Sequence, residues 1–165
     1  MNALENQFHR ELWLKNVWGI ENLTIENSSL ERFSILYSYH PELYHLNISG
    51  QKLNEINVKW RFKYPLGKSV KISAPNLRYL KWVGYITGHN CLGSLMHLEC
   101  VELFLQCRDL DLTQELSNVL RSVISTKDLH LHDQHIIMVK RHFLSYLLKT
   151  IILYTCQILF VELVR

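Results

Sequence analysis

The amino-acid sequence predicts an α/β solenoid, a stack of coils with short parallel strands and few helices. Three observations predict this fold class: a short apolar motif recurs, its copies have a constant spacing, and turn-forming residues lie between them. The 165 residues are 48% hydrophobic and 20% charged, which is enough apolar material for one domain with a core. The net charge of +3 is too small to indicate nucleic-acid binding by itself.

The recurring motif has the form apolar-x-x-apolar-x-apolar. Its last three positions alternate as in a β-strand, where residues two apart point to one face. Copies of the motif begin at Ile20, Leu30, Leu43, Leu53, Leu77 and Leu98. We expect each copy to form a short strand.

Two interleaved series of apolar positions share spacings of 23 and then 24 residues. The series are Leu23, Leu46, Val70 and Phe33, Ile56, Leu80. The simplest geometry is a coil of about 23 residues with two strands, one on each side of a flattened solenoid, and leucine-rich repeats have periods of about 20–29 residues. Coils stack because one coil cannot bury its own apolar edge. The alternative, an ordinary domain with chance repetition, does not account for the constant spacing.

The pattern changes after Leu105. Two acidic residues, Asp109 and Asp111, precede apolar residues at helical spacing that continue to Val123, and acidic residues stabilise the start of a helix. The segment from Lys127 to Leu131 alternates again. We expect a helix followed by another strand.

The chain is divided into an N-terminal lead-in (1–15), a repeat region (16–134) and an apolar C-terminal helical segment (135–165). Residues 143–164 are long enough to span a bilayer of about 30 Å, although Lys149 and Glu162 lie among them. Three interpretations remain open. The segment is a helix that caps the solenoid, a membrane tail anchor, or a tail without selected structure that arose from a shifted reading frame or a retained intron.

Three runs, Ile20–Ile25, Leu53–Trp60 and above all Lys71–Trp82 (KISAPNLRYLKW), resemble the repeats of plant F-box/leucine-rich-repeat proteins, many of which end in an FBD domain. The resemblance implies the substrate-recognition part of an SCF-type ubiquitin ligase receptor, which binds a target protein in the cytoplasm or nucleus. In that family an F-box binds a Skp-type adaptor and a cullin. Residues 1–17 resemble no F-box, so we expect these two partners only if an F-box is supplied upstream.

An extracellular or membrane-attached leucine-rich-repeat ligand-binding protein is the alternative. Glycosylation sequons begin at Asn22, Asn27 and Asn47, and they would matter in a secreted protein. The segment Met1–Lys15 does not resemble a signal peptide, because charged residues interrupt it. The four cysteines show no C-x-x-C spacing, which favours a reduced intracellular context.

A basic region with aromatic residues is the candidate partner-binding site. Between Ile56 and Leu98 there is no Asp or Glu. Arg and Lys with Trp and Tyr suit an acidic or phosphorylated partner, although a solvated basic face is the simpler interpretation. The candidate residues are Lys59, Trp60, Arg61, Lys63, Lys71, Arg78, Tyr79 and Lys81.

Strand alternation also predicts which side chains face outward. One series of outward residues is Thr24, Asn47, Lys71 and Glu102, and the other is Ser34, Asn57 and Lys81.

We expect no catalytic residue, no cofactor and no metal site, and we expect that the protein is not an enzyme. His130, His132, Asp133 and His135 cluster, but zinc normally takes four ligands at recognised spacings. No nucleophile elbow or phosphate-binding loop is present. Acidic residues between Glu99 and Glu115 balance the basic region and disfavour nucleic acid as a partner.

Overall fold

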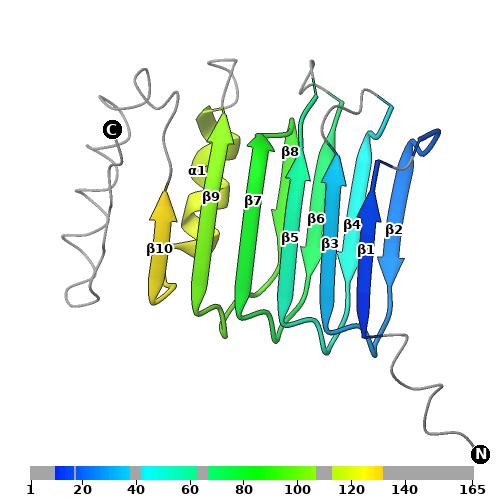
Figure 1. The fold of residues 1–165 in the computed structure, drawn as a ribbon. Helices are drawn as coiled ribbons and strands as arrows, with labels where there is room; N and C mark the ends of the chain where they lie inside the picture. The colour runs from blue at the N-terminus through cyan, green and yellow to red at the C-terminus, as the bar shows by residue number, and fades with distance from the viewer. Residues whose placement is uncertain (1–9, 17, 38–41, 63–66, 107–112, 132–165) are drawn as a thin grey trace, which may run out of the picture.

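The computed structural model describes residues 10–16, 18–37, 42–62, 67–106 and 113–131. These residues form a parallel β solenoid with two sheets and one helix (Figure 1). The strands are β1 (Glu11–Lys15), β2 (Asn22–Glu26), β3 (Arg32–Tyr37), β4 (His45–Ser49), β5 (Glu55–Trp60), β6 (Ser69–Ser73), β7 (Tyr79–Tyr85), β8 (His89–Leu92), β9 (Cys100–Gln106) and β10 (Asp128–Leu131). The helix is α1 (Thr113–Val123).

The chain alternates between the two sheets as it winds. Sheet A has the order β1-β3-β5-β7-β9-β10, and sheet B has the order β2-β4-β6-β8. All pairings are parallel within each sheet, and the strands of sheet B run opposite to those of sheet A (Figure 1). Each coil therefore contributes one strand to each sheet.

The register confirms the predicted coil of about 23 residues. In sheet B, Leu23 pairs with Leu46 and Leu46 with Val70. In sheet A, the pairing runs through Phe33, Ile56, Leu80 and Val101. Equivalent positions of successive coils thus stack directly, and their apolar side chains form continuous columns in the core.

The core lies between the two sheets and is made by inward side chains at alternate strand positions. Phe33, Ile56 and Leu80 are completely buried, as are the two indoles of Trp60 and Trp82. Trp60 and Phe62 pack edge to face with ring centroids 5.0 Å apart. Burial of such large apolar side chains is the main source of stability in the middle coils.

Gly84 is required where β7 passes β5. It pairs with Trp60 across the two strands and has φ +146°, a conformation that L-residues rarely adopt. A Cβ at this position would overlap the backbone carbonyl of Trp60. Only glycine fits here without moving one of the two strands.

A helix replaces sheet B in the last described coil. Asn90, in β8, takes the place of an inward apolar residue, and its side chain donates to Glu115 of α1 over 3.2 Å. Thr87 donates to Asn90 Oδ1 over 2.5 Å. Helix α1 packs beside β8 and β10 extends sheet A, which confirms the helix and the strand that the sequence predicts after Leu105.

Sheet A begins within the predicted lead-in (1–15), because β1 pairs with β3. The predicted apolar C-terminal helical segment, 135–165, lies outside the described residues. In the part of the chain that the structure describes, no helix is both long and apolar enough to cross a membrane.

Candidate partner-binding surface

The outer face of sheet A consists of side chains from alternate positions, aligned in rows across the strands. The first row is Glu11, Arg32, Glu55, Tyr79, Cys100 and Asp128. The middle row is Trp13, Ser34, Asn57, Lys81, Glu102 and His130. The last row, toward the carboxyl ends of the strands, is Lys15, Leu36, Lys59, Val83 and Phe104.

A hydrogen-bonded cluster joins β7 and β9 on this face. Glu102 accepts hydrogen bonds from Lys81 Nζ over 2.5 Å and from Tyr79 Oη over 2.6 Å. Burial alone would raise the pKa of the Glu102 carboxyl, but the hydrogen bonds from Lys81 and Tyr79 outweigh it and lower that pKa. Burial, followed by the hydrogen bond to Glu102, raises the pKa of Tyr79 well above its ordinary value. The phenol therefore remains a donor and the carboxylate an acceptor at neutral pH.

Cys100 lies beside this cluster in the first row. Burial, and then the charges of Glu102 and Asp128, raise the pKa of its thiol. Nucleophilic cysteines need the opposite shift, because the thiolate is the reactive form. The arrangement suits a structural or contact role for Cys100.

Ion pairs cross the strands at their amino ends. Glu11 pairs with Arg32, and Arg78 Nε lies 4.0 Å from a carboxylate oxygen of Glu99. These side chains are more than one third exposed, so each pair contributes at most about 1 kcal/mol. The pairs nevertheless neutralise much of the charge at this edge.

The last row has a different character, because it mixes lysines with half-buried apolar side chains. Lys59 is exposed between Leu36 and Val83, and the ring of Phe104 lies 5.5 Å from Lys81 Nζ. The row contains no acidic residue. It forms an apolar strip with positive charges beside it.

The structure brings together only part of the predicted basic site. On or beside the outer face of sheet A lie Lys59, Arg61, Arg78, Tyr79 and Lys81.

The other three residues of the predicted basic site are not found on the outer face of sheet A. Lys71 points outward from β6 on sheet B, away from the others. Trp60 is completely buried, so it stabilises the core and presents no surface to a partner. Lys63 lies outside the described residues.

Glu102 was predicted to face outward in the series that contains Thr24 and Lys71, and this assignment is wrong. Glu102 pairs with Lys81 in sheet A, whereas Cys91 pairs with Lys71 in sheet B. The correction matters because it places an acid beside the predicted basic residues.

Lys68 belongs to the same basic region of the sequence, but it is buried and does not lie on the outer face of sheet A. Its Nζ is buried, donates to the carbonyl of Leu43 and lies 4.3 Å from the centroid of the Tyr44 ring. Burial lowers the pKa of this amine. These contacts join the segment before β4 to the segment before β6, which is a structural role.

The outer face of sheet B is polar. Its rows are Asn22, His45, Ser69, His89 and Thr24, Asn47, Lys71, Cys91. Of the three sequon asparagines, Asn22 is exposed and Asn47 half-buried, while Asn27 Oδ1 accepts from the backbone N–H of Ser29 over 2.7 Å.

A groove of about 480 Å³ lies at the corner where the coils enter sheet A, and only polar side chains line it, among them Glu31, Arg78 and Glu99. Small-molecule sites are mostly apolar, so the polar lining of this groove is not typical of such a site. In the described residues no three or more His, Cys, Asp or Glu side chains form a group that could hold a metal ion. Of the predicted histidine cluster, His130 is in β10, and His132, Asp133 and His135 lie outside the described residues.

Comparisons with family models, with curated proteins and with solved structures found no match to this chain.

Proposed function

We propose that this chain is a leucine-rich-repeat module that binds another protein through the outer face of sheet A and does no chemistry of its own. It would be the substrate-recognition part of a receptor of the SCF ubiquitin ligase type, as the resemblance of Lys71–Trp82 to such repeats suggests. The observation that carries the proposal is the last row of sheet A, a rigid strip of lysines and apolar side chains.

The geometry of the strip suggests the chemistry of the partner. Neighbouring strands are about 4.8 Å apart, so Lys15 and Lys59, two strands apart, stand about 10 Å from each other with Leu36 between them. An extended segment laid across the strands could place two acidic or phosphorylated side chains on these lysines. Apolar side chains of the same segment would contact Leu36 and, further along, Val83 and Phe104.

The distribution of ion pairs favours the last row of sheet A, over the other two rows, as the place where an acidic partner binds. Lys81 already pairs with Glu102 and Arg78 with Glu99, so these two cations are partly neutralised. Among the described residues of a single chain, Lys15, Lys59 and Arg61 take part in no ion pair, and Lys59 and Arg61 also lie away from β1. A partner would gain more from the unneutralised cations.

Lys59→Glu and Lys71→Glu form a matched pair of variants. Both lysines are exposed, both point outward from the middle of the stack, and they lie on opposite sheets. Wild type and both variants would be used to capture proteins from cell extract, with quantitative mass spectrometry as the measurement. We expect Lys59→Glu to lower capture of the specific partner at least about tenfold, and Lys71→Glu to leave it unchanged. Equal loss in both variants, or in neither, would refute the assignment to sheet A.

The adaptor gives a separate test. Because residues 1–17 resemble no F-box, we expect a purified Skp-type adaptor not to bind the 165-residue chain. Direct binding would contradict this part of the proposal while leaving the Lys59 result to decide the binding face. Sugar found on Asn22 or Asn47 would instead favour the extracellular alternative.

A further inference from the structure

We infer that the N-terminal end of the solenoid is an interface with a second copy of this chain, formed by antiparallel pairing of β1 with β1 of the copy about a two-fold axis.

The first argument is the incomplete burial of the end coil. The inward side chains Leu12 and Leu14 of β1, and Leu23 and Ile25 of β2, are only half-buried, whereas their partners in the next coil are buried. Trp13, on the outer face of β1, is 63% exposed. A tryptophan exposed beside half-buried leucines is typical of a surface that another protein covers.

The second argument is the backbone. The amide of Asn16 donates to Leu36 O and the carbonyl of Arg10 accepts from the amide of Arg32, so even-numbered residues of this strand direct their polar backbone groups to β3. The direction of these groups alternates along a strand. Glu11, Trp13 and Lys15 therefore direct their backbone N–H and C=O groups to the other edge of β1, which no described strand covers. Within the described residues β1 pairs with β3 alone. An edge of this kind is a template for another strand.

The third argument identifies the occupant, because the segment Glu11-Leu-Trp-Leu-Lys15 is complementary to itself when it is reversed. Antiparallel pairing centred on Trp13 places Glu11, which also pairs with Arg32 of its own chain, opposite Lys15 of the copy, and Lys15 opposite Glu11 of the copy. It also places leucine opposite leucine and Trp13 opposite Trp13 of the copy. A two-fold interface requires this kind of self-complementarity, and each favourable contact occurs twice.

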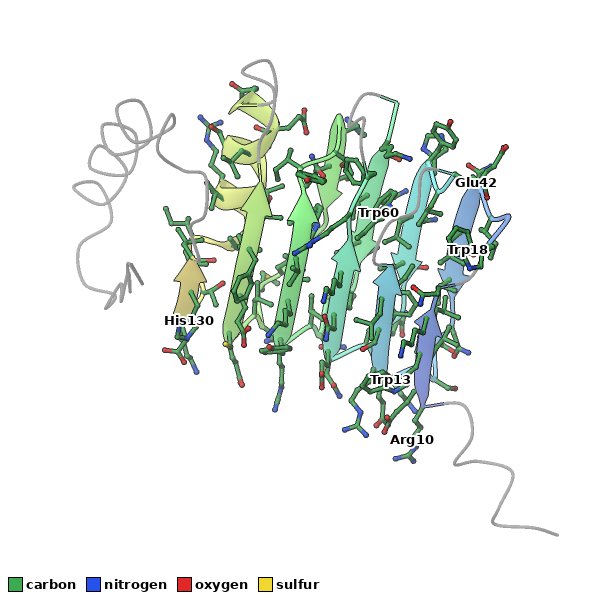
Figure 2. All side chains as sticks on the ribbon, turned by 45° about the horizontal axis from the view of Figure 1, so that its top comes forward. Arg10, Trp13, Trp18, Glu42, Trp60 and His130 are labelled. Atoms are coloured by element: carbon green, nitrogen blue, oxygen red, sulfur yellow. The ribbon has the colours of Figure 1, made fainter. Side chains whose placement is uncertain are left out.

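The register also suits the open edge. The three residues that face one another in this pairing are the three whose backbone groups point to that edge, so each facing pair can exchange two backbone hydrogen bonds. An axis midway between the two Trp13 residues, perpendicular to sheet A, would continue this sheet into the copy. The same two-fold rotation brings the half-buried edge of β2 to face β2 of the second chain. Figure 2 shows Trp13 and Trp18 at this end of the stack, with His130 at the other.

Charge reversal tests the pairing. Analytical ultracentrifugation of the full chain over a range of concentrations should show a monomer–dimer equilibrium. Lys15→Glu places like charges opposite each other twice, and we expect it to weaken the dimer about tenfold or more. The double variant Glu11→Lys/Lys15→Glu should restore most of the dimer, the remaining loss coming from the ion pair of Glu11 with Arg32 that it removes. Lys127→Glu, an equal change of charge at an exposed residue beside β10 at the opposite end of sheet A, should have no effect. A chain that is monomeric at every concentration, or a dimer indifferent to Lys15→Glu, would overturn the inference.

A cysteine on the axis tests the register. Residues that pair with their own copy in an antiparallel sheet have Cα atoms about 5.5 Å apart, within disulfide range. Mild oxidation of Trp13→Cys should therefore yield far more covalent dimer than wild type, which controls for the native cysteines. Lys59→Cys, on an outward position of β5, should remain at the wild-type level. Equal cross-linking of the two variants would show that the contact is not centred on Trp13.

Discussion

The middle coils and the N-terminal coil share one pattern of alternating apolar residues, yet they differ in what that pattern achieves. Val58 and Leu80, in the middle, are completely buried, whereas Leu12 and Leu23, at the end, are half-buried. The side chains are of the same kind. They differ in burial because a middle coil has a neighbouring coil on both sides, whereas the described end coil has one on a single side. Stability in this fold is therefore a property of neighbouring coils more than of any single coil.

The largest difference should appear between two tryptophans. Trp82→Ala removes a completely buried indole from the middle coils and should lower the free energy of unfolding by about 4 kcal/mol. Trp18, near the end coil, is 69% exposed, and Trp18→Ala should cost less than about 1 kcal/mol. Urea denaturation followed by circular dichroism measures both. Similar losses would mean that the end coil is as tightly packed as the middle.

Two glycines distinguish the cost of an unfavourable φ from the cost of a steric overlap with a neighbouring strand. Gly84→Ala should destabilise the fold by about 3 kcal/mol, because the added methyl group meets the backbone of Trp60 and φ is unfavourable. Gly67 also has positive φ, +77°, but no atom lies within 4 Å of the added methyl group. Gly67→Ala should therefore cost about 1 kcal/mol. Thermal unfolding of the two variants gives the comparison, and a Gly84→Ala variant as stable as Gly67→Ala would contradict the close approach of β5 and β7.

Two leucines in one column test the effect of position alone. Leu46→Ala should lower the free energy of unfolding by about 3 kcal/mol, since Leu46 has a coil on each side. Leu23→Ala should cost about half as much in a monomer, because Leu23 is already partly exposed. At protein concentrations high enough for copies to associate, the loss in the free energy of unfolding caused by Leu23→Ala should become closer to the loss caused by Leu46→Ala. A Leu23 loss that equals the Leu46 loss in dilute solution would remove the distinction between the coils.

The smallest effect concerns Glu102 on sheet A. Because the pKa of its carboxyl is lower in the folded protein, its contribution to stability is present above the unfolded pKa and is lost as the pH falls through the folded value. Glu102→Gln keeps the shape and removes the titration. Wild type should therefore lose stability more steeply than Glu102→Gln between about pH 5 and pH 3. Parallel pH profiles would show that the hydrogen bonds from Lys81 and Tyr79 do not stabilise the carboxylate.

The columns of the core could be predicted from the sequence because each coil repeats its apolar positions. Leu23, Leu46 and Val70 are uniformly apolar and evenly spaced, and the structure places them side by side. Strand β8 was missed because Asn90 occupies an inward position where the pattern expects an apolar residue. Its hydrogen bonds to Thr87 and Glu115 replace the burial of an apolar side chain.

The omission of β8 also explains the wrong assignment of Glu102. If no strand is recognised at 89–92, the next alternating segment falls to sheet B, although it belongs to sheet A. A usable signal was present: Arg78 and Lys81 are each followed by a glutamate 21 residues later, one coil along the chain, and both pairs form ion pairs. Ile56 and Val58 point inward, and the same alternation, continued by two residues, also places Trp60 in the core.

At the corner before sheet A, the carbonyl of each coil accepts backbone hydrogen bonds from the next. Glu31 O accepts from Asn54 and Glu55, and Asn54 O accepts from Arg78 and Tyr79. These bonds, like those between the strands, lie along the stacking direction, so tension applied between the two ends of the stack loads the successive coil–coil interfaces in series. The chain should then yield by unwinding one coil at a time from an end. Each step would release about 23 residues and about 80 Å of extended chain, a staircase that single-molecule stretching can resolve.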